Sequence, residues 1–107
     1  LEEALGLGLR SGFGDDILRI GGIKAFADGA LGPHTAAMLE PYADDPGNRG
    51  MLLLDAEEIF EFGRSAAAGG LPLSIHAIGD RANHAALEAF TRLRAWEREN
   101  GLAPLRH

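Results

Sequence analysis

The chain has 107 residues, of which 46% are apolar and 24% charged, and this is typical of one ordinary globular domain. Its formal net charge of −6 argues against a nucleic-acid or membrane-surface partner, and no apolar run approaches the ~20 residues that span a bilayer. The absence of cysteine excludes disulfides and thiolate metal sites, so any metal ligand must be His, Asp, Glu or a modified Lys. The absence of cysteine is also typical of a cytoplasmic protein, which is the expected location.

The two ends of the chain indicate a piece of something longer. The chain begins without methionine, inside an expected short helix over residues 1–9. It stops just after Gly101 and Pro104, which would end one element and begin the next. We therefore expect residues 1–107 to be an internal segment of a larger protein.

Residues 17–27 form a largely apolar run, which predicts a strand buried on both faces, as in a parallel sheet. Lys24 lies deep in this run, where an unpaired ammonium is costly to bury. Such a lysine can be a neutral nucleophile, a Schiff-base former, or a residue that carbon dioxide carboxylates into an anionic metal ligand. The other interpretation is an ion pair between Lys24 and an acid such as Asp28.

Residues 28–50 are rich in Gly, Pro, Asp and Asn and show neither helical nor strand periodicity. A loop of this length in a compact domain is usually functional or disordered. Because the loop directly follows the run that carries Lys24, a substrate-facing loop is favoured over a flexible connector. His34, within it, is either a substrate contact or a solvated residue.

The second half of the chain predicts a regular alternation of helix and strand. Asp55 and Glu58 match the capping-box pattern that begins a helix, and Asp80 is the expected N-cap of a second, longer helix. The elements are expected in the order helix, strand, helix and incipient strand, at residues 55–70, 71–77, 80–100 and from Leu105 onward. This run of βα units indicates an α/β fold with a parallel sheet.

His76 ends the second predicted strand, where α/β enzymes place catalytic groups and ligands. From the residues alone it is either a metal ligand or catalytic base, or an ordinary buried histidine. His84 lies on an amphipathic helix and is expected at the surface. His107, at the chain end, supports no interpretation, and no Walker, HExxH or dinucleotide motif is present.

Several short motifs occur in a characteristic order: Gly22–Gly32 (GIKAFADGALG), Thr35–Ala36, Glu40–Tyr42, Asp44–Gly50 and His76–Ala82 (HAIGDRA). In this order the chain resembles the amidohydrolase superfamily, in the branch that includes N-substituted formamide deformylases and many metal-dependent hydrolases. The resemblance covers nearly all of the chain from about Leu18 onward.

The resemblance implies a partial (β/α)₈ TIM-barrel fragment of about two βα units with parallel strands, from a family that binds one or two divalent metals, usually zinc. It implies that Lys24 is the fourth-strand lysine, which is carboxylated and bridges metals in some members. It also implies that His76 is the fifth-strand metal ligand. Residues 28–35 would be the loop over a small-molecule amide-type substrate, with Asp28 and His34 as candidate contacts.

The same resemblance implies that most of the active site lies outside the chain. The His-X-His pair of the first strand would precede Leu1, the sixth-strand histidine would follow His107, and the catalytic aspartate of the eighth strand is absent. The parent protein is expected to hydrolyse a non-peptide carbon–nitrogen bond with metal-activated water. The fragment alone is expected to be inactive and to self-associate through its exposed strand edges.

Two alternatives to this enzyme remain open on the sequence. One is a non-catalytic α/β interaction module in which Lys24 and His76 are structural. The other is an enzyme that uses Lys24 to form a Schiff base.

Overall fold

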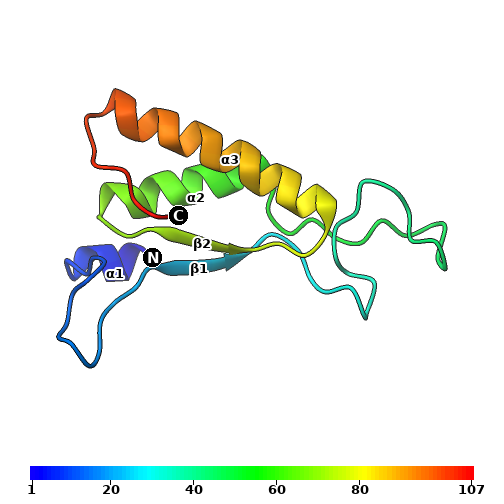
Figure 1. Cartoon of the computed structure of the whole chain (residues 1–107), viewed down its shortest axis with the longest axis horizontal. Coiled ribbons are helices and arrows are strands. Elements are labelled where there is room, and N and C mark those ends of the chain that lie inside the picture. The colour runs from blue at the N-terminus through cyan, green and yellow to red at the C-terminus, as the bar shows by residue number, and fades with distance from the viewer.

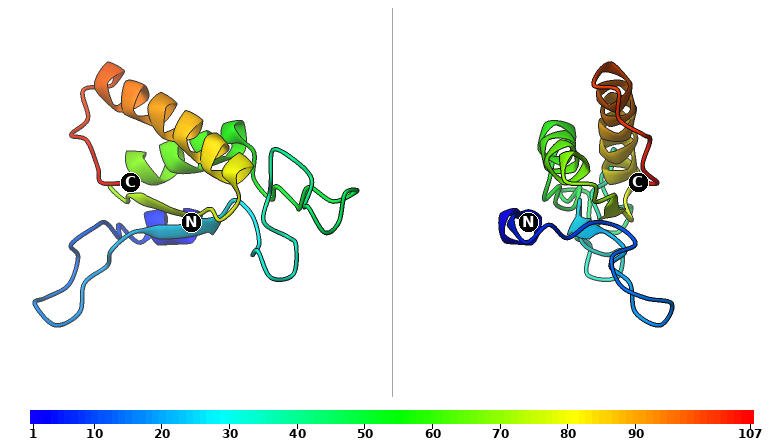
Figure 2. Two further views of the ribbon diagram at one scale, coloured as in Figure 1. Left: turned by 45° about the vertical axis from the view of Figure 1, so that its right-hand side comes forward. Right: turned by 90° about the vertical axis from the view of Figure 1, so that its left-hand side faces the viewer.

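A computed structural model describes all of residues 1–107 and contains a two-stranded parallel sheet with two long helices. The elements follow in the order α1 (Glu2–Gly6), β1 (Ile23–Phe26), α2 (Ala56–Ala68), β2 (Leu73–His76) and α3 (Asp80–Glu99) (Figure 1). The α2 and α3 helices pack against each other and lie together on one side of the sheet (Figures 1 and 2). The expected α/β class with parallel βα units is therefore confirmed. None of the helices combines the length and the apolarity that a membrane crossing requires.

The two faces of the sheet differ because successive side chains of a strand point to opposite sides. The face toward the helices packs on a core of small and aliphatic residues and carries Ile23, Ala25, Leu73 and Ile75. The opposite face, which no helix covers, carries Lys24, Phe26, Ser74 and His76. The register therefore gives the chain one closed face and one open face.

The prediction of a strand over residues 17–27 was wrong in its first half, because only Ile23–Phe26 is strand. Residues 12–20 form instead an exposed hairpin-like loop, in which the Ile20 amide donates to the Phe13 carbonyl at 2.8 Å and Ile17 is 95% exposed. Asp15 organises the loop by accepting from the amides of Leu18 and Ile17. These two hydrogen bonds, that of Leu18 first, lower the pKa of the Asp15 carboxyl below its ordinary value. Local turn chemistry thus outweighs the apolar composition of this segment.

The expectation that Lys24 is buried, with its strand covered on both faces, was also wrong. Its side chain is exposed on the open face, and its Nζ atom lies 5.4 Å from the centre of the Phe26 ring. The alternative ion pair with Asp28 is wrong as well, because the Asp28 carboxylate binds backbone amides and not Lys24. Two strands alone leave one side of a sheet without a covering layer, and Lys24 lies on that side.

The α2 helix begins at the predicted capping box. The Glu58 amide donates to the Asp55 carboxylate at 2.8 Å, and the Asp55 amide donates to the Glu58 carboxylate at 3.3 Å. Two of the orphan amides of the first turn are satisfied in this way. The buried side of the helix, which contacts α3, carries Ile59, Gly63, Ala66 and Ala67.

The α3 helix begins differently from the prediction, because its N-cap is Gly79 and Asp80 is its first residue. Asp80 Oδ1 accepts from the amides of Leu39 and Arg81, each at 2.8 Å, so it links the loop after β1 to the helix. The third strand expected from Leu105 is not formed. Residues 102–107 instead run back toward the sheet as an irregular segment.

The loop predicted over residues 28–50 contains no helix or strand, and the long loop in the structure covers residues 27–55. It is not a loose connector. Ala36 and Ala37 are fully buried, and Ala37 belongs to the same core cluster as Ile59 and Leu73. The Tyr42 hydroxyl donates to the Ala36 carbonyl at 2.7 Å. Burial and hydrogen bonds therefore fix the loop against the carboxyl ends of the strands.

The closest approach between this loop and the turn after β2 occurs at Gly79. A Cβ atom built on Gly79 would lie 1.8 Å from the Ala37 carbonyl oxygen, although its φ of −69° suits any residue. The absence of a side chain at Gly79 is thus a condition for bringing the two segments together.

Replacing Gly79 with alanine should lower the free energy of unfolding by at least about 1–3 kcal/mol, because backbone atoms must move apart to admit the methyl group. Urea denaturation measures the change. Gly32→Ala in the same loop is the matched control, since a Cβ there meets nothing within 4 Å. Equal midpoints for the two variants would contradict the close approach.

Candidate functional site

The open face of the sheet carries Lys24 at the second residue of β1 and His76 at the last residue of the neighbouring strand β2. Phe26 pairs with His76 in register, and the two rings lie 5.1 Å apart between centroids. Lys24 Nζ lies over the same phenyl ring, 5.4 Å from its centre. The structure therefore gathers the two predicted metal ligands around one aromatic ring, on one exposed surface.

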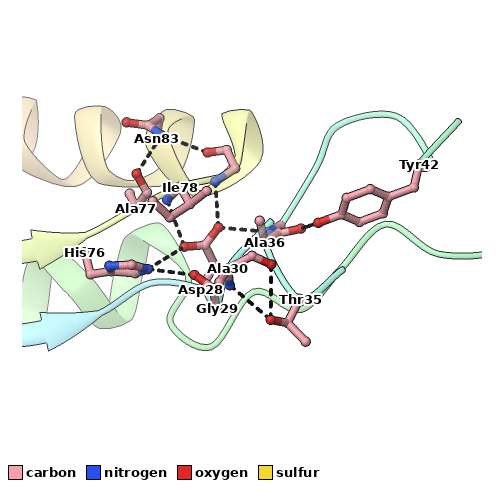
Figure 3. Close-up of polar contacts among 12 residues, drawn as sticks. Asp28, Gly29, Ala30, Thr35, Ala36, Tyr42, His76, Ala77, Ile78 and Asn83 are labelled. Atoms are coloured by element: carbon pink, nitrogen blue, oxygen red, sulfur yellow. Dashed lines mark hydrogen bonds and ion pairs between the residues drawn. The ribbon is translucent and has the colours of Figure 1, made fainter. Parts of the chain in front are cut away.

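The orientation of the His76 ring is set by a hydrogen bond to the loop after β1. Its Nε2 atom lies 2.6 Å from the Gly29 carbonyl oxygen (Figure 3). A carbonyl oxygen can only accept, so Nε2 carries the proton and donates. In the neutral ring this leaves the lone pair on Nδ1, the state in which a histidine coordinates a metal.

Asp28 lies next to the His76 ring and is almost completely buried, with 1% exposure. Its Oδ2 atom accepts from the amides of Ala37 at 2.8 Å and Gly79 at 2.7 Å, and its Oδ1 atom accepts from the Ile78 amide at 3.0 Å. Oδ1 also lies 3.8 Å from His76 Nε2 (Figure 3). The contacts seen in the structure are thus to backbone, and a substrate contact by Asp28 stays a prediction.

The Gly29 carbonyl that accepts the hydrogen bond from His76 belongs to a short loop closed by Thr35. The Gly29 amide donates to the Thr35 carbonyl at 3.2 Å, and the Ala30 amide donates to the Thr35 hydroxyl at 3.0 Å (Figure 3). A Cβ on Gly29 would lie 2.1 Å from the Thr35 hydroxyl oxygen. Sequence and packing together therefore fix the carbonyl that orients His76.

His34 lies farther along the same loop and makes contacts only within it. Its ring stacks on Tyr42 with centroids 4.4 Å apart, and its Nε2 lies 3.3 Å from Asp44 Oδ2. The Asn48 side chain donates to its carbonyl at 3.1 Å. No hydrogen bond, ion pair or ring contact joins His34 to the open face. Its role as a substrate contact stays a prediction.

Sequence reasoning missed two members of the open face and the role of Asp28. Ser74 pairs with Lys24 in register and is exposed beside it, and the Phe26 ring contacts both Lys24 and His76. The period-two alternation of the strands was the signal that could have found both residues. The amide partners of Asp28 had no comparable signal, because one lies nine residues farther along the same loop and the other two lie in the turn after β2.

The remaining histidines lie elsewhere. His84 is exposed on α3, as expected. His107 is buried near the amino end of β2, where its Nδ1 accepts from the Leu73 amide at 3.0 Å and its Nε2 contacts the buried Glu97 carboxylate. Arg94 also donates to Glu97, at 2.8 Å. This cluster holds the last residues of the chain against α3 and β2.

The donor set of the open face fits part of a metal centre. His76 Nδ1 is a nitrogen ligand that zinc accepts, and Lys24 would provide an oxygen ligand if carboxylated. Nowhere in the chain do three or more His, Cys, Asp or Glu side chains gather as a metal cluster. Catalytic zinc sites have three protein ligands, and the two candidate ligands of the open face, His76 and Lys24, are fewer than that.

Comparison with known proteins agrees with this geometry. The profile of the Amidohydrolase family matches residues 1–106. The chain is 41% identical to the putative amidohydrolase YtcJ of Bacillus subtilis over 75 residues, or 70% of the chain and 14% of that protein. It is 42% identical to the protein LONG AFTER FAR-RED 3 of Arabidopsis thaliana over 78 residues, or 73% of the chain and 13% of that protein.

A solved structure matches the fold as well as the sequence. It is that of an uncharacterized metal-dependent hydrolase from Pyrococcus furiosus, with a TM-score of 0.81 and 41% identity over 87% of the chain and 20% of that protein. The chain thus spans about a seventh to a fifth of the length of its relatives. The parallel βα units and this match are consistent with a partial (β/α)₈ barrel.

Proposed function

The chain belongs to the amidohydrolase family, and on this premise we propose that it is an internal segment, the fourth and fifth βα units, of a metal-dependent hydrolase. The observation that carries the proposal is the shared open face of Lys24 and His76, on adjacent parallel strands. In a closed (β/α)₈ barrel, side chains that point away from the helices line the interior, and those at the carboxyl ends of strands form the active site.

In this proposal His76 binds a divalent metal, zinc being the expected one, through Nδ1. The hydrogen bond from Nε2 to the Gly29 carbonyl supports this role, because metal-bound histidines donate their other ring proton to a carbonyl or carboxylate. Lys24 is the second ligand and acts as a carbamate formed with carbon dioxide. The exposure of Lys24 supports this, since its side-chain amine is accessible to carbon dioxide and to a metal.

The proposed reaction is hydrolysis of a non-peptide carbon–nitrogen bond of amide type in a small molecule. A bound divalent metal supplies Lewis-acid polarisation of the carbonyl and lowers the pKa of coordinated water toward about 7. In this proposal His76 and Lys24 would hold the metal, and the Phe26 ring contacts both side chains on the same surface. The loop with Asp28 and His34 would cover the substrate.

The alternative of a non-catalytic interaction module receives no support from the open face. In that alternative Lys24 and His76 are structural, yet Lys24 makes no hydrogen bond or ion pair and is exposed. A Schiff-base enzyme would be identified by borohydride trapping of a carbonyl substrate on Lys24.

The ligand assignment is tested by His76→Ala in the full-length protein. We expect loss of bound divalent metal, measured by elemental analysis, and a fall of at least about 100-fold in kcat/KM for an N-acyl substrate, since a ligand has been removed. His84→Ala, which changes an exposed histidine on α3, is the matched control and should alter neither quantity. Full metal content in the His76→Ala protein would refute the assignment.

The isolated 107-residue chain should show no measurable turnover of N-acyl substrates, with or without added zinc, because it supplies only part of a ligand set. It should also self-associate, since the open sheet face and both strand edges lack partners. Light scattering and an activity assay measure the two outcomes. A zinc-dependent activity, or a stable monomer, would contradict the corresponding part of the proposal.

A further inference from the structure

We propose that Asp28 is a positioning residue, whose buried carboxylate joins the loop after β1 to the turn after β2 and thereby holds His76 in its ligand orientation. This inference rests on the proposed role of His76 as a metal ligand. It assigns to Asp28 a function different from the substrate contact that the family resemblance implies.

The donors around Asp28 come from two parts of the chain. The carboxylate accepts hydrogen bonds from three backbone amides, at 2.7–3.0 Å. One of them, Ala37, belongs to the long loop, and the other two, Ile78 and Gly79, follow His76 in the chain. A single carboxylate therefore ties the two segments that border the open face at its carboxyl edge (Figure 3).

The main chain of His76 and the hydrogen bond of its ring both depend on this junction. Its backbone leads directly into Ile78 and Gly79, which Asp28 holds. Its ring donates to the Gly29 carbonyl at 2.6 Å, and Gly29 is the residue after Asp28. Moving Asp28 would therefore displace the main chain of His76 and the acceptor of its ring proton together.

The charge of Asp28 also makes this junction sensitive to substitution. A buried carboxylate is stable only when donors compensate its lost hydration, and backbone amides do so here. An asparagine has the same shape, but its amide nitrogen cannot accept. At least one of the three backbone amides would then face another donor, because both oxygens of Asp28 are acceptors in the structure.

The test compares Asp28→Asn with the wild-type full-length protein, and takes Asp80→Asn as the matched control. Asp80 also joins the long loop to α3, by accepting from the Leu39 and Arg81 amides, but it has no contact with His76 or Gly29. Both amides bind Oδ1 of Asp80, so Asp80→Asn removes a carboxylate charge but keeps the acceptor. An effect of lost charge alone would appear in both variants, whereas a loss of positioning would appear only in Asp28→Asn.

Two readouts are needed, and the first requires no metal. Nitrogen NMR of ¹⁵N-histidine-labelled protein, at a pH where imidazole is neutral, reports which ring nitrogen of His76 carries the proton. We expect the Nε2-protonated form in the wild type and in Asp80→Asn, and a mixture of the two forms in Asp28→Asn. The second readout is zinc affinity by calorimetry, which should weaken about 10–100-fold in Asp28→Asn and stay unchanged in Asp80→Asn.

The outcomes separate this inference from the proposed function. An unchanged His76 ring signal in Asp28→Asn, or equal effects of the two substitutions, would overturn the positioning role. Absence of zinc binding in the wild type, with the ring signal still altered by Asp28→Asn, would overturn the proposed function and leave the positioning role supported.

If Asp28→Asn does not fold, hydrogen exchange of the wild-type protein tests whether Asp28 binds the three backbone amides. The amides of Ala37, Ile78 and Gly79 should then be strongly protected, and rapid exchange at these three positions would refute the junction.

Discussion

The structure depends on one buried carboxylate that accepts hydrogen bonds from two distant segments. Asp28 is 1% exposed, and such a group is costly to bury unless donors surround it. Its donors come from residue 37 and from residues 78–79, so the long loop and the turn after β2 must both be in place before the charge is satisfied. Gly79 makes the approach possible because it has no side chain toward Ala37. The position of His76 follows from the same junction.

The second constraint is the alternation of side chains along two short strands. One face is covered by α2 and α3 and is apolar, and the other carries Lys24, Phe26, Ser74 and His76 without cover. In a (β/α)₈ barrel, side chains at the carboxyl ends of the strands form the active site. A lysine and a histidine on the uncovered face of the sheet are typical of that arrangement. The same alternation that builds the core thus presents the candidate ligands on the open side.

Much of the fold could be predicted from local signals, and the failures have physical causes. The capping box of Asp55 and Glu58 was predicted correctly because it depends on residues three apart in the chain. The segment from Ile17 to Ile20 was wrongly predicted as strand, because the Asp15 side chain closes a turn that overrides apolar composition. Lys24 was wrongly expected to be buried, since the number of strands beside it cannot be counted from one run of sequence. The network of Asp28 could not be predicted, because its donors lie 9 to 51 residues away.

The central claim is that His76 presents Nδ1 to a metal on the open face. The most direct measurement is anomalous diffraction from crystals of the full-length protein grown with zinc. The account predicts an anomalous peak within bonding distance of His76 Nδ1, with Nε2 still bound to the Gly29 carbonyl. A peak at Nε2, or a fully occupied zinc site that leaves His76 unbound, would contradict it.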